Sequence, residues 1–100
     1  MSTTTDEAAQ LLLAAWKGAT RINGLPSRCR PTDLDQGYAI QDALLLATGE
    51  ALGGHKIAAT SVAGQQHIGI THPITGGLLS SQIRSPGAQV SLSGNQMCAA

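Results

Sequence analysis

The chain has 100 residues, with six basic and six acidic side chains and therefore no formal net charge at neutral pH. That balance argues against a nucleic-acid or anionic-membrane partner, because both require a basic patch, which the sequence lacks. Hydrophobic residues make up 42% of the chain, but Trp16 and Tyr38 are the only aromatic ones. A chain of this length forms one small domain at most, with a core built mainly from Ala and Leu.

The sequence predicts a soluble, cytoplasmic protein. The N-terminus has no basic region before an apolar run, and no apolar run is long enough to span a membrane. Cys29 and Cys98 lie far apart, and neither has a C-x-x-C partner. They are expected to be free thiols in a reducing compartment, with a single disulfide between them as the alternative.

The first predicted helix begins at a capping box formed by Thr4 and Glu7, and Gly18 is expected to end it. Apolar residues follow the box at helical spacing, namely Ala8, Leu11, Leu12, Ala15 and Trp16. Residues 21–30 are a polar stretch with Gly, Pro and Arg, which predicts a surface loop.

A second helix is predicted after Pro31, with Thr32 as its N-cap, and it is expected to run to about Ala47. Asp33 and Asp35 then lie in the first turn, where negative charge favours the exposed amides. Apolar residues cover two faces of this helix, one with Leu34, Tyr38, Gln41 and Leu45, the other with Ile40, Ala43, Leu44 and Ala47. Such a helix is expected to be buried on two sides, which requires a further layer of structure.

Lys56 is the most informative residue of the next segment. It is a lone cation in residues 53–60, a stretch of small or apolar residues that predicts a short strand. Burying an ammonium group is costly unless it is paired or solvated in a cleft, so Lys56 is a candidate site residue. The alternative is an edge strand from which the lysine simply reaches water.

The remaining segments are predicted to be short. Ser61 is expected to cap a helix through His67 or Ile68 that Gly69 ends. After it we expect an extended His72-Pro73, a short apolar piece at Leu78-Leu79, a turn at Pro86-Gly87 and a strand containing Val90 and Leu92.

The three histidines do not suggest a metal site. His67 and His72 are five residues apart, and the intervening Gly69 breaks any helix that would place them on one face. No carboxylate occurs after Glu50 to complete a site with His55. We therefore expect ordinary histidines, and no nucleophile or phosphate-loop motif is present.

Four segments taken in order resemble one enzyme family. They are Tyr38-Ala39-Ile40-Gln41-Asp42, Gly54-His55-Lys56-Ile57, Thr60-Ser61 and Gly77-Leu78-Leu79. Together they are similar to the 2-keto-4-pentenoate hydratases, also called 2-hydroxypentadienoate hydratases, of the fumarylacetoacetate hydrolase superfamily. The resemblance extends over essentially the whole chain.

The resemblance implies an α+β fold, in which N-terminal helices pack on the start of a mixed, barrel-like β core. Residues 1–100 would be the N-terminal portion of a single hydratase domain. The implied reaction adds water to 2-hydroxypenta-2,4-dienoate to give 4-hydroxy-2-oxopentanoate in the meta-cleavage catabolism of aromatic compounds. Mg²⁺ or Mn²⁺ would stabilise the developing enolate.

By the same resemblance, Lys56 matches the family's active-site lysine and is the expected catalytic residue. Thr60 and Ser61 are expected to contact the substrate. Leu78 or Leu79 would line the pocket wall, although packing in a core is the favoured interpretation of these two leucines.

One departure from the family concerns the metal. The family's carboxylate ligands, including a Glu-x-Glu pair, follow the region that resembles Met97–Ala100, whereas every acidic residue here lies at or before Glu50. No metal ligand is therefore expected within this chain. The apolar ending has the character of an interrupted strand, so the chain is expected to be a truncated piece that is inactive alone.

Two other functions remain open on the sequence. The 2-oxo-3-hexenedioate decarboxylases share the N-terminal pattern and release CO2 from a dicarboxylate. A non-catalytic interaction module would suit the two-sided apolar helix. A homo-oligomer is expected from the family, and so is a possible association with the pathway decarboxylase.

Overall fold

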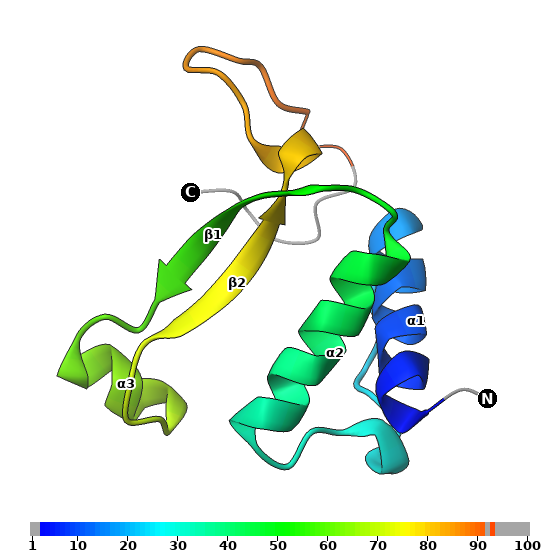
Figure 1. The fold of residues 1–100 in the computed structure, drawn as a ribbon, viewed down its shortest axis with the longest axis vertical. Coiled ribbons are helices and arrows are strands. Elements are labelled where there is room, and N and C mark those ends of the chain that lie inside the picture. Colours follow the sequence, from blue (N-terminus) through cyan, green and yellow to red (C-terminus); the bar gives the residue numbers. More distant parts are fainter. Residues whose placement is uncertain (1–2, 92, 94–100) are drawn as a thin grey trace. The chain divides into compact units, whose positions relative to one another are not determined.

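A computed structural model describes residues 3–91 and 93, and within them the chain is α+β, as predicted (Figure 1). The described residues form three α-helices, two short 3-10 helices (η1, η2) and one two-stranded sheet. They divide into two compact units. One contains the residues up to Gly49 together with those from Ser85 onward, and the other is Glu50–Arg84.

Helix α1 (Thr4–Lys17) begins one residue earlier than predicted. Its N-cap is Thr3, whose Oγ1 accepts a hydrogen bond from the amide of Asp6 at 3.0 Å. The Asp6 carboxylate accepts in return from the amide of Thr3, which completes the capping box. The predicted box of Thr4 and Glu7 was therefore wrong, because the Glu7 carboxylate binds Arg28 instead.

The end of α1 carries an unusual left-handed residue. Gly18 is the C-cap, as predicted, but it has a right-handed φ of −82°. The left-handed residue is Ala19, with φ +50°. The amides of Ala19 and Thr20 donate to the carbonyls of Trp16 and Ala15, at 3.1 and 2.9 Å, which is the Schellman pattern. An alanine therefore occupies a position that usually requires glycine.

Helix α2 (Leu34–Ala47) ends where predicted but has a different cap. Asp33 is the N-cap, and its Oδ1 accepts from the amide of Gln36 at 2.8 Å. Thr32 instead donates its amide to the Gln36 side chain at 3.0 Å. Two residues can cap this end, and the charged Asp33 takes the cap because it also interacts favourably with the helix dipole.

Within the described residues, α2 is buried along one stripe only, and the further layer that its second apolar face is expected to need is not among them. Ile40 is the only buried residue of α2. Leu46, by contrast, is 82% exposed. Ile40 packs with residues of α1 and of the segment that connects α1 to α2.

The core of the first unit joins three elements. Ala8 of α1, Cys29 of η1 (Ser27–Cys29) and Ile40 of α2 are buried together, and Leu12 and Leu25 pack against them. Figure 1 shows that α1 and α2 begin at the same end of the unit, because the connecting segment runs back along them. The predicted surface loop over residues 21–30 thus contributes Cys29 to the core, because it must cover one end of the helix pair.

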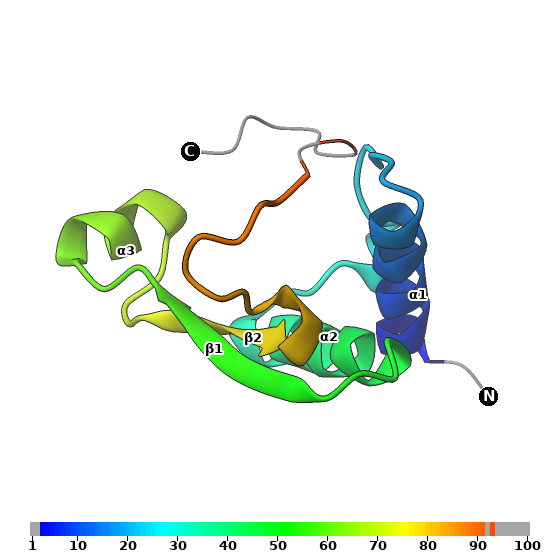
Figure 2. The ribbon, with the colours of Figure 1, turned by 90° about the horizontal axis from the view of Figure 1, so that it is seen from above.

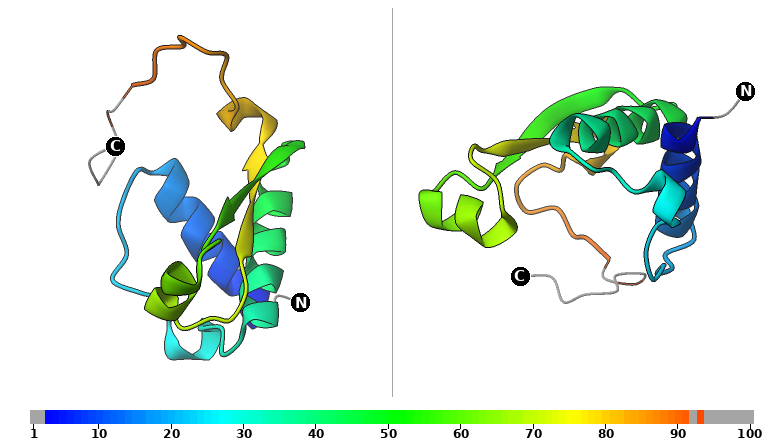
Figure 3. Two further views of the ribbon diagram at one scale, coloured as in Figure 1. Left: turned by 90° about the vertical axis from the view of Figure 1, so that its left-hand side faces the viewer. Right: turned by 90° about the horizontal axis from the view of Figure 1, so that it is seen from below.

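The second unit is built on an antiparallel pair, β1 (Leu52–Ala58) and β2 (Ile74–Leu79). The register shifts between Leu52 and Gly54, so Gly53 forms a bulge. Figures 2 and 3 show the two strands side by side, with α3 at the end of the pair where β1 stops and β2 begins. A barrel-like β core is not confirmed, because within the described residues the sheet has two strands and is open.

Helix α3 (Val62–Ile68) matches its prediction at both ends. The Oγ of Ser61 accepts from the amide of Gly64 at 3.0 Å and caps the first turn. Gly69 ends the helix in the left-handed region, with φ +74°. Local capping rules therefore locate this helix from the sequence alone.

Two predictions concern the last part of the chain. Pro86-Gly87 forms the expected turn, with the amide of Ala88 donating to the Ser85 carbonyl at 3.1 Å. At Val90 the predicted strand was wrong, because this residue belongs to no strand in the described part of the chain and is 63% exposed. Leu92, Cys98 and the expected interrupted strand at 97–100 lie outside the described residues.

No helix in the described ranges is long and apolar enough to cross a bilayer.

Candidate active site

Lys56 lies near the middle of β1, and its side chain is exposed. The register pairs it with Gly76 of β2, which has no side chain. An exposed ammonium opposite a glycine has open space above the sheet, and a Cβ built on Gly76 would contact nothing within 4 Å. The cation is therefore accessible to a small anion and carries no cost of burial.

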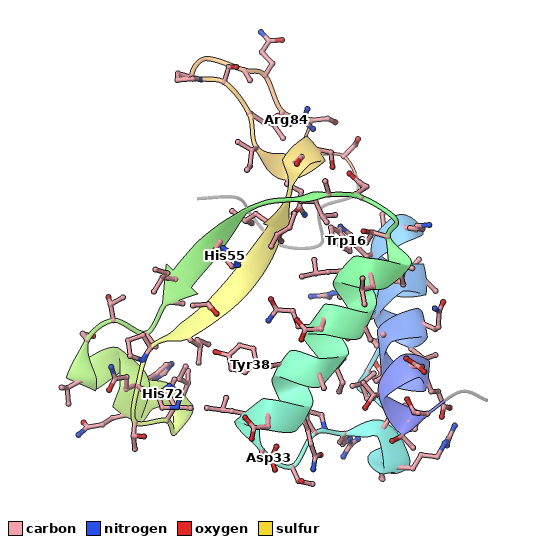
Figure 4. The ribbon with its side chains drawn as sticks, viewed as in Figure 1. Trp16, Asp33, Tyr38, His55, His72 and Arg84 are labelled. Carbon is pink, nitrogen blue, oxygen red and sulfur yellow. The ribbon has the colours of Figure 1, made fainter. Side chains whose placement is uncertain are left out.

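The register also determines which residues share the Lys56 face. Side chains alternate between the two faces of a strand, so the pairs two positions away on either side lie on the same face as Lys56 and Gly76. These pairs are Gly54 with Leu78 and Ala58 with Ile74. Lys56 and Leu78, two of the predicted site residues, are thereby brought to one face of the sheet. His55, labelled in Figure 4, belongs to the opposite face.

The two predicted leucines differ in their surroundings. Leu79 is 2% exposed, whereas Leu78 is half-buried. The amide of Leu79 donates to the Gln82 side chain in η2 (Ser80–Gln82) at 2.8 Å, which anchors that end of β2. Leu79 is thus a core residue, and Leu78 is the leucine with surface left to contact a ligand.

Thr60 and Ser61 follow β1 at the corner where the chain enters α3, and both are exposed. The Ser61 oxygen already accepts the amide of Gly64, which leaves its hydroxyl proton as the group it can still donate. Ala59, directly before Thr60, has a left-handed backbone with φ +56°. Strained backbone conformations of this kind are concentrated at functional sites.

The described residues do not by themselves offer a donor set for a divalent cation. Residues 3–91 and 93 contain no group of three His, Cys, Asp or Glu side chains that a metal ion would need. Nδ1 of His72 (Figure 4) lies 2.9 Å from the Pro73 carbonyl oxygen, which can only accept, so this nitrogen carries the proton.

A second polar cluster, not anticipated from the sequence, lies in the first unit. Nε of Arg28 donates to Oε2 of Glu7 at 3.2 Å, and Nη2 donates to Oε1. The hydrogen bonds from Arg28, followed by that from Cys29, lower the pKa of Glu7. Burial, and then the hydrogen bond to Glu7, raises the pKa of the Cys29 thiol. This cluster joins η1 to α1 and is structural. Only the opposite charges of Glu7 and Arg28 hinted at it, because 21 residues separate them.

Comparison with curated proteins finds similarity to TodF product hydratase of Pseudomonas putida. The two sequences are 33% identical over 89 residues, which cover 86% of this chain and 33% of the relative. The chain thus spans about a third of the length of the relative that it matches. No protein-family model matches the chain. No solved structure matches it either.

Proposed function

We propose that the whole protein hydrates 2-hydroxypenta-2,4-dienoate to 4-hydroxy-2-oxopentanoate in the catabolism of aromatic compounds. The proposal starts from the sequence relationship to the 2-keto-4-pentenoate hydratase family, which the resemblance predicted. The match to a named hydratase supports hydration as the reaction class. The single structural observation that carries the proposal is the placement of Lys56. An accessible ammonium shares one face of the sheet with the half-buried Leu78, which suits a small carboxylate that bears an apolar tail.

The reaction chemistry explains the need for a cation at this point. Ketonisation of the dienol places a proton on the terminal carbon. Water then adds across the remaining double bond, with its hydroxyl going to C4 and its proton to C3. In both steps negative charge develops on the 2-oxygen, next to the carboxylate. We assign Lys56 to hold that carboxylate and relay a proton. Thr60 and Ser61 are assigned to form hydrogen bonds with the polar end of the substrate. Leu78 is assigned to contact its carbon chain.

Further properties belong to the proposal for the whole protein. We propose that it uses Mg²⁺ or Mn²⁺ held by carboxylates outside residues 1–100, and that the 100-residue chain is inactive alone. We also propose a cytoplasmic homo-oligomer that associates with the pathway decarboxylase.

A chimera tests the function directly. The matched third of the Pseudomonas putida hydratase is replaced by this chain, and loss of dienoate absorbance and formation of the hydroxy-oxo acid are followed. We expect the chimera to hydrate the dienoate, and Lys56→Met should lower the rate of hydration at least a hundredfold. Lys17→Met is the control, because it removes another exposed lysine, and it should leave the rate unchanged. A folded chimera without hydratase activity, or with activity insensitive to Lys56→Met, contradicts the proposal. CO2 release from 2-oxo-3-hexenedioate would instead support the decarboxylase.

An interaction module is the second candidate, and exposed apolar side chains favour it. Leu46 is 82% exposed, Val62 68% and Ile57 61%. Light scattering of the purified chain during size-exclusion chromatography distinguishes the two functions. A discrete, soluble complex together with an inactive chimera would support the module, because the enzyme proposal requires an active chimera.

A further inference from the structure

The corner between β1 and α3 is held in a strained shape. Ala59 adopts φ +56°, a left-handed conformation in which the Cβ of an alanine comes too close to the following carbonyl oxygen. A conformation of this kind persists only where surrounding interactions impose it. Glycine, the usual residue for such a position, is absent here, so the interactions around Ala59 must supply the constraint.

Gln65 of α3 supplies the main constraint. Its Nε2 donates to the Ala59 carbonyl oxygen at 3.1 Å, and Gln65 is half-buried. The backbone of the same residue donates its amide to the Ser61 carbonyl at 3.0 Å. One residue therefore holds the corner on both sides of Thr60, at Ala59 through its side chain and at Ser61 through its main chain.

Gly64 and Ser61 tighten the same corner. A Cβ built on Gly64 would lie 3.2 Å from the Ser61 Oγ and 3.6 Å from the Ala59 Cα, so the first turn of α3 approaches the corner closely. The Ser61 Oγ accepts the Gly64 amide at 3.0 Å. With both neighbours of Thr60 held in this way, Thr60 itself has little freedom to turn relative to the end of β1.

We propose that Gln65 is a positioning residue, which sets the orientation of Thr60 at the end of the Lys56 strand by holding Ala59 left-handed. The role rests on the proposed function, since Thr60 is assigned there to the polar end of the substrate. Gln65 acts through the backbone of Ala59 and touches no substrate. It therefore defines the arrangement of the 2-oxo acid subsite and leaves the charge of Lys56 unchanged.

The test uses the full chain, with the stable 2-oxo acid 2-oxopentanoate as the probe and NMR as the readout. Gln65→Leu removes the donor at similar size, and Gln66→Leu makes the same change at the exposed neighbouring glutamine. We expect Gln65→Leu to weaken probe binding by roughly three- to tenfold, the range for one lost hydrogen bond. It should also weaken the intraresidue amide-to-Hα NOE of Ala59, a signature of positive φ. Gln66→Leu should change neither readout.

Rescue separates positioning from general destabilisation. Adding Ala59→Gly to Gln65→Leu removes the Cβ penalty of the left-handed corner and should restore most of the binding. Wild-type binding in Gln65→Leu, or equal losses in Gln65→Leu and Gln66→Leu, would overturn the inference and leave the proposed function standing. A third comparison tests the proposed function itself, with Gln65 left intact. If the Lys56→Met variant binds the probe as tightly as the wild-type chain does, the proposed function fails, and the substrate-positioning role of Gln65 fails with it.

Discussion

The guanidinium of Arg28 binds both carboxylate oxygens of Glu7, and this pair ties η1 to the first turns of α1. Glu7 is free to bind Arg28 because Asp6 completes the capping box with Thr3. Next to Arg28 in the sequence, Cys29 is buried beside Ala8 and Ile40, so the ion pair and this buried side chain both attach the connecting segment to the helices.

The first prediction concerns acid stability. The pKa of Glu7 is lower in the folded chain than its ordinary value, chiefly because of Arg28, so the pair stabilises the fold above the ordinary glutamate pKa of about 4.3. That stabilisation is lost as the pH falls through the lowered pKa. We expect Glu7→Gln to lower the Tm at pH 7 and to flatten the fall in Tm between pH 5 and 3, since the titrating group is gone.

Asp42→Asn is the control for that experiment, because it removes an exposed carboxylate from α2. It should leave the steepness of the acid transition unchanged. Arg28→Met should lower the Tm at pH 7 as Glu7→Gln does. Equal acid transitions in the wild type and Glu7→Gln would show that the ion pair does not contribute to folding stability.

The second prediction concerns the core of the first unit. Ile40→Ala removes a buried side chain between α1 and η1 and should cost about 2–4 kcal/mol in the free energy of unfolding, measured by urea denaturation. Leu46→Ala, on the same helix but at an 82% exposed position, should stay within about 0.5 kcal/mol. Similar costs at the two positions would mean that α2 is buried on its other face as well.

The third prediction concerns the β1 bulge. A Cβ on Gly53 would lie 2.9 Å from the Cα of Ser80 and from Cδ1 of Ile83, so Gly53→Ala should push η2 away from β1. We expect a cost of about 1–3 kcal/mol. We also expect faster hydrogen exchange at the Ser80 amide, which donates to the Ala51 carbonyl at 2.9 Å. Gly76→Ala, where the added Cβ meets nothing within 4 Å, should leave this exchange unchanged, and an effect of equal size there would refute the steric explanation.

The fourth prediction concerns the end of α1. Ala19→Gly should raise the free energy of unfolding by about 1 kcal/mol, because glycine adopts the observed φ of +50° without a Cβ penalty. Ala14→Gly, at an exposed position inside the same helix, should lower it by about 1 kcal/mol. Thermal denaturation of both variants is the measurement, and the prediction fails if the two substitutions change stability in the same direction.

The sequence by itself determined the three helices, their approximate ends, the strand around Lys56 and the resemblance to a hydratase family. These features depend on residues within a few positions of one another, such as Ser61 with Gly64, and local hydrogen bonds and apolar spacing specify them. Only the tertiary structure decided that Glu7 binds Arg28 and that the Lys56 ammonium is exposed. It alone also decided that the β1–β2 register places Leu78 on the face of Lys56. These outcomes depend on contacts between residues about twenty or more positions apart, where several partners satisfy the same local rules and packing selects one of them.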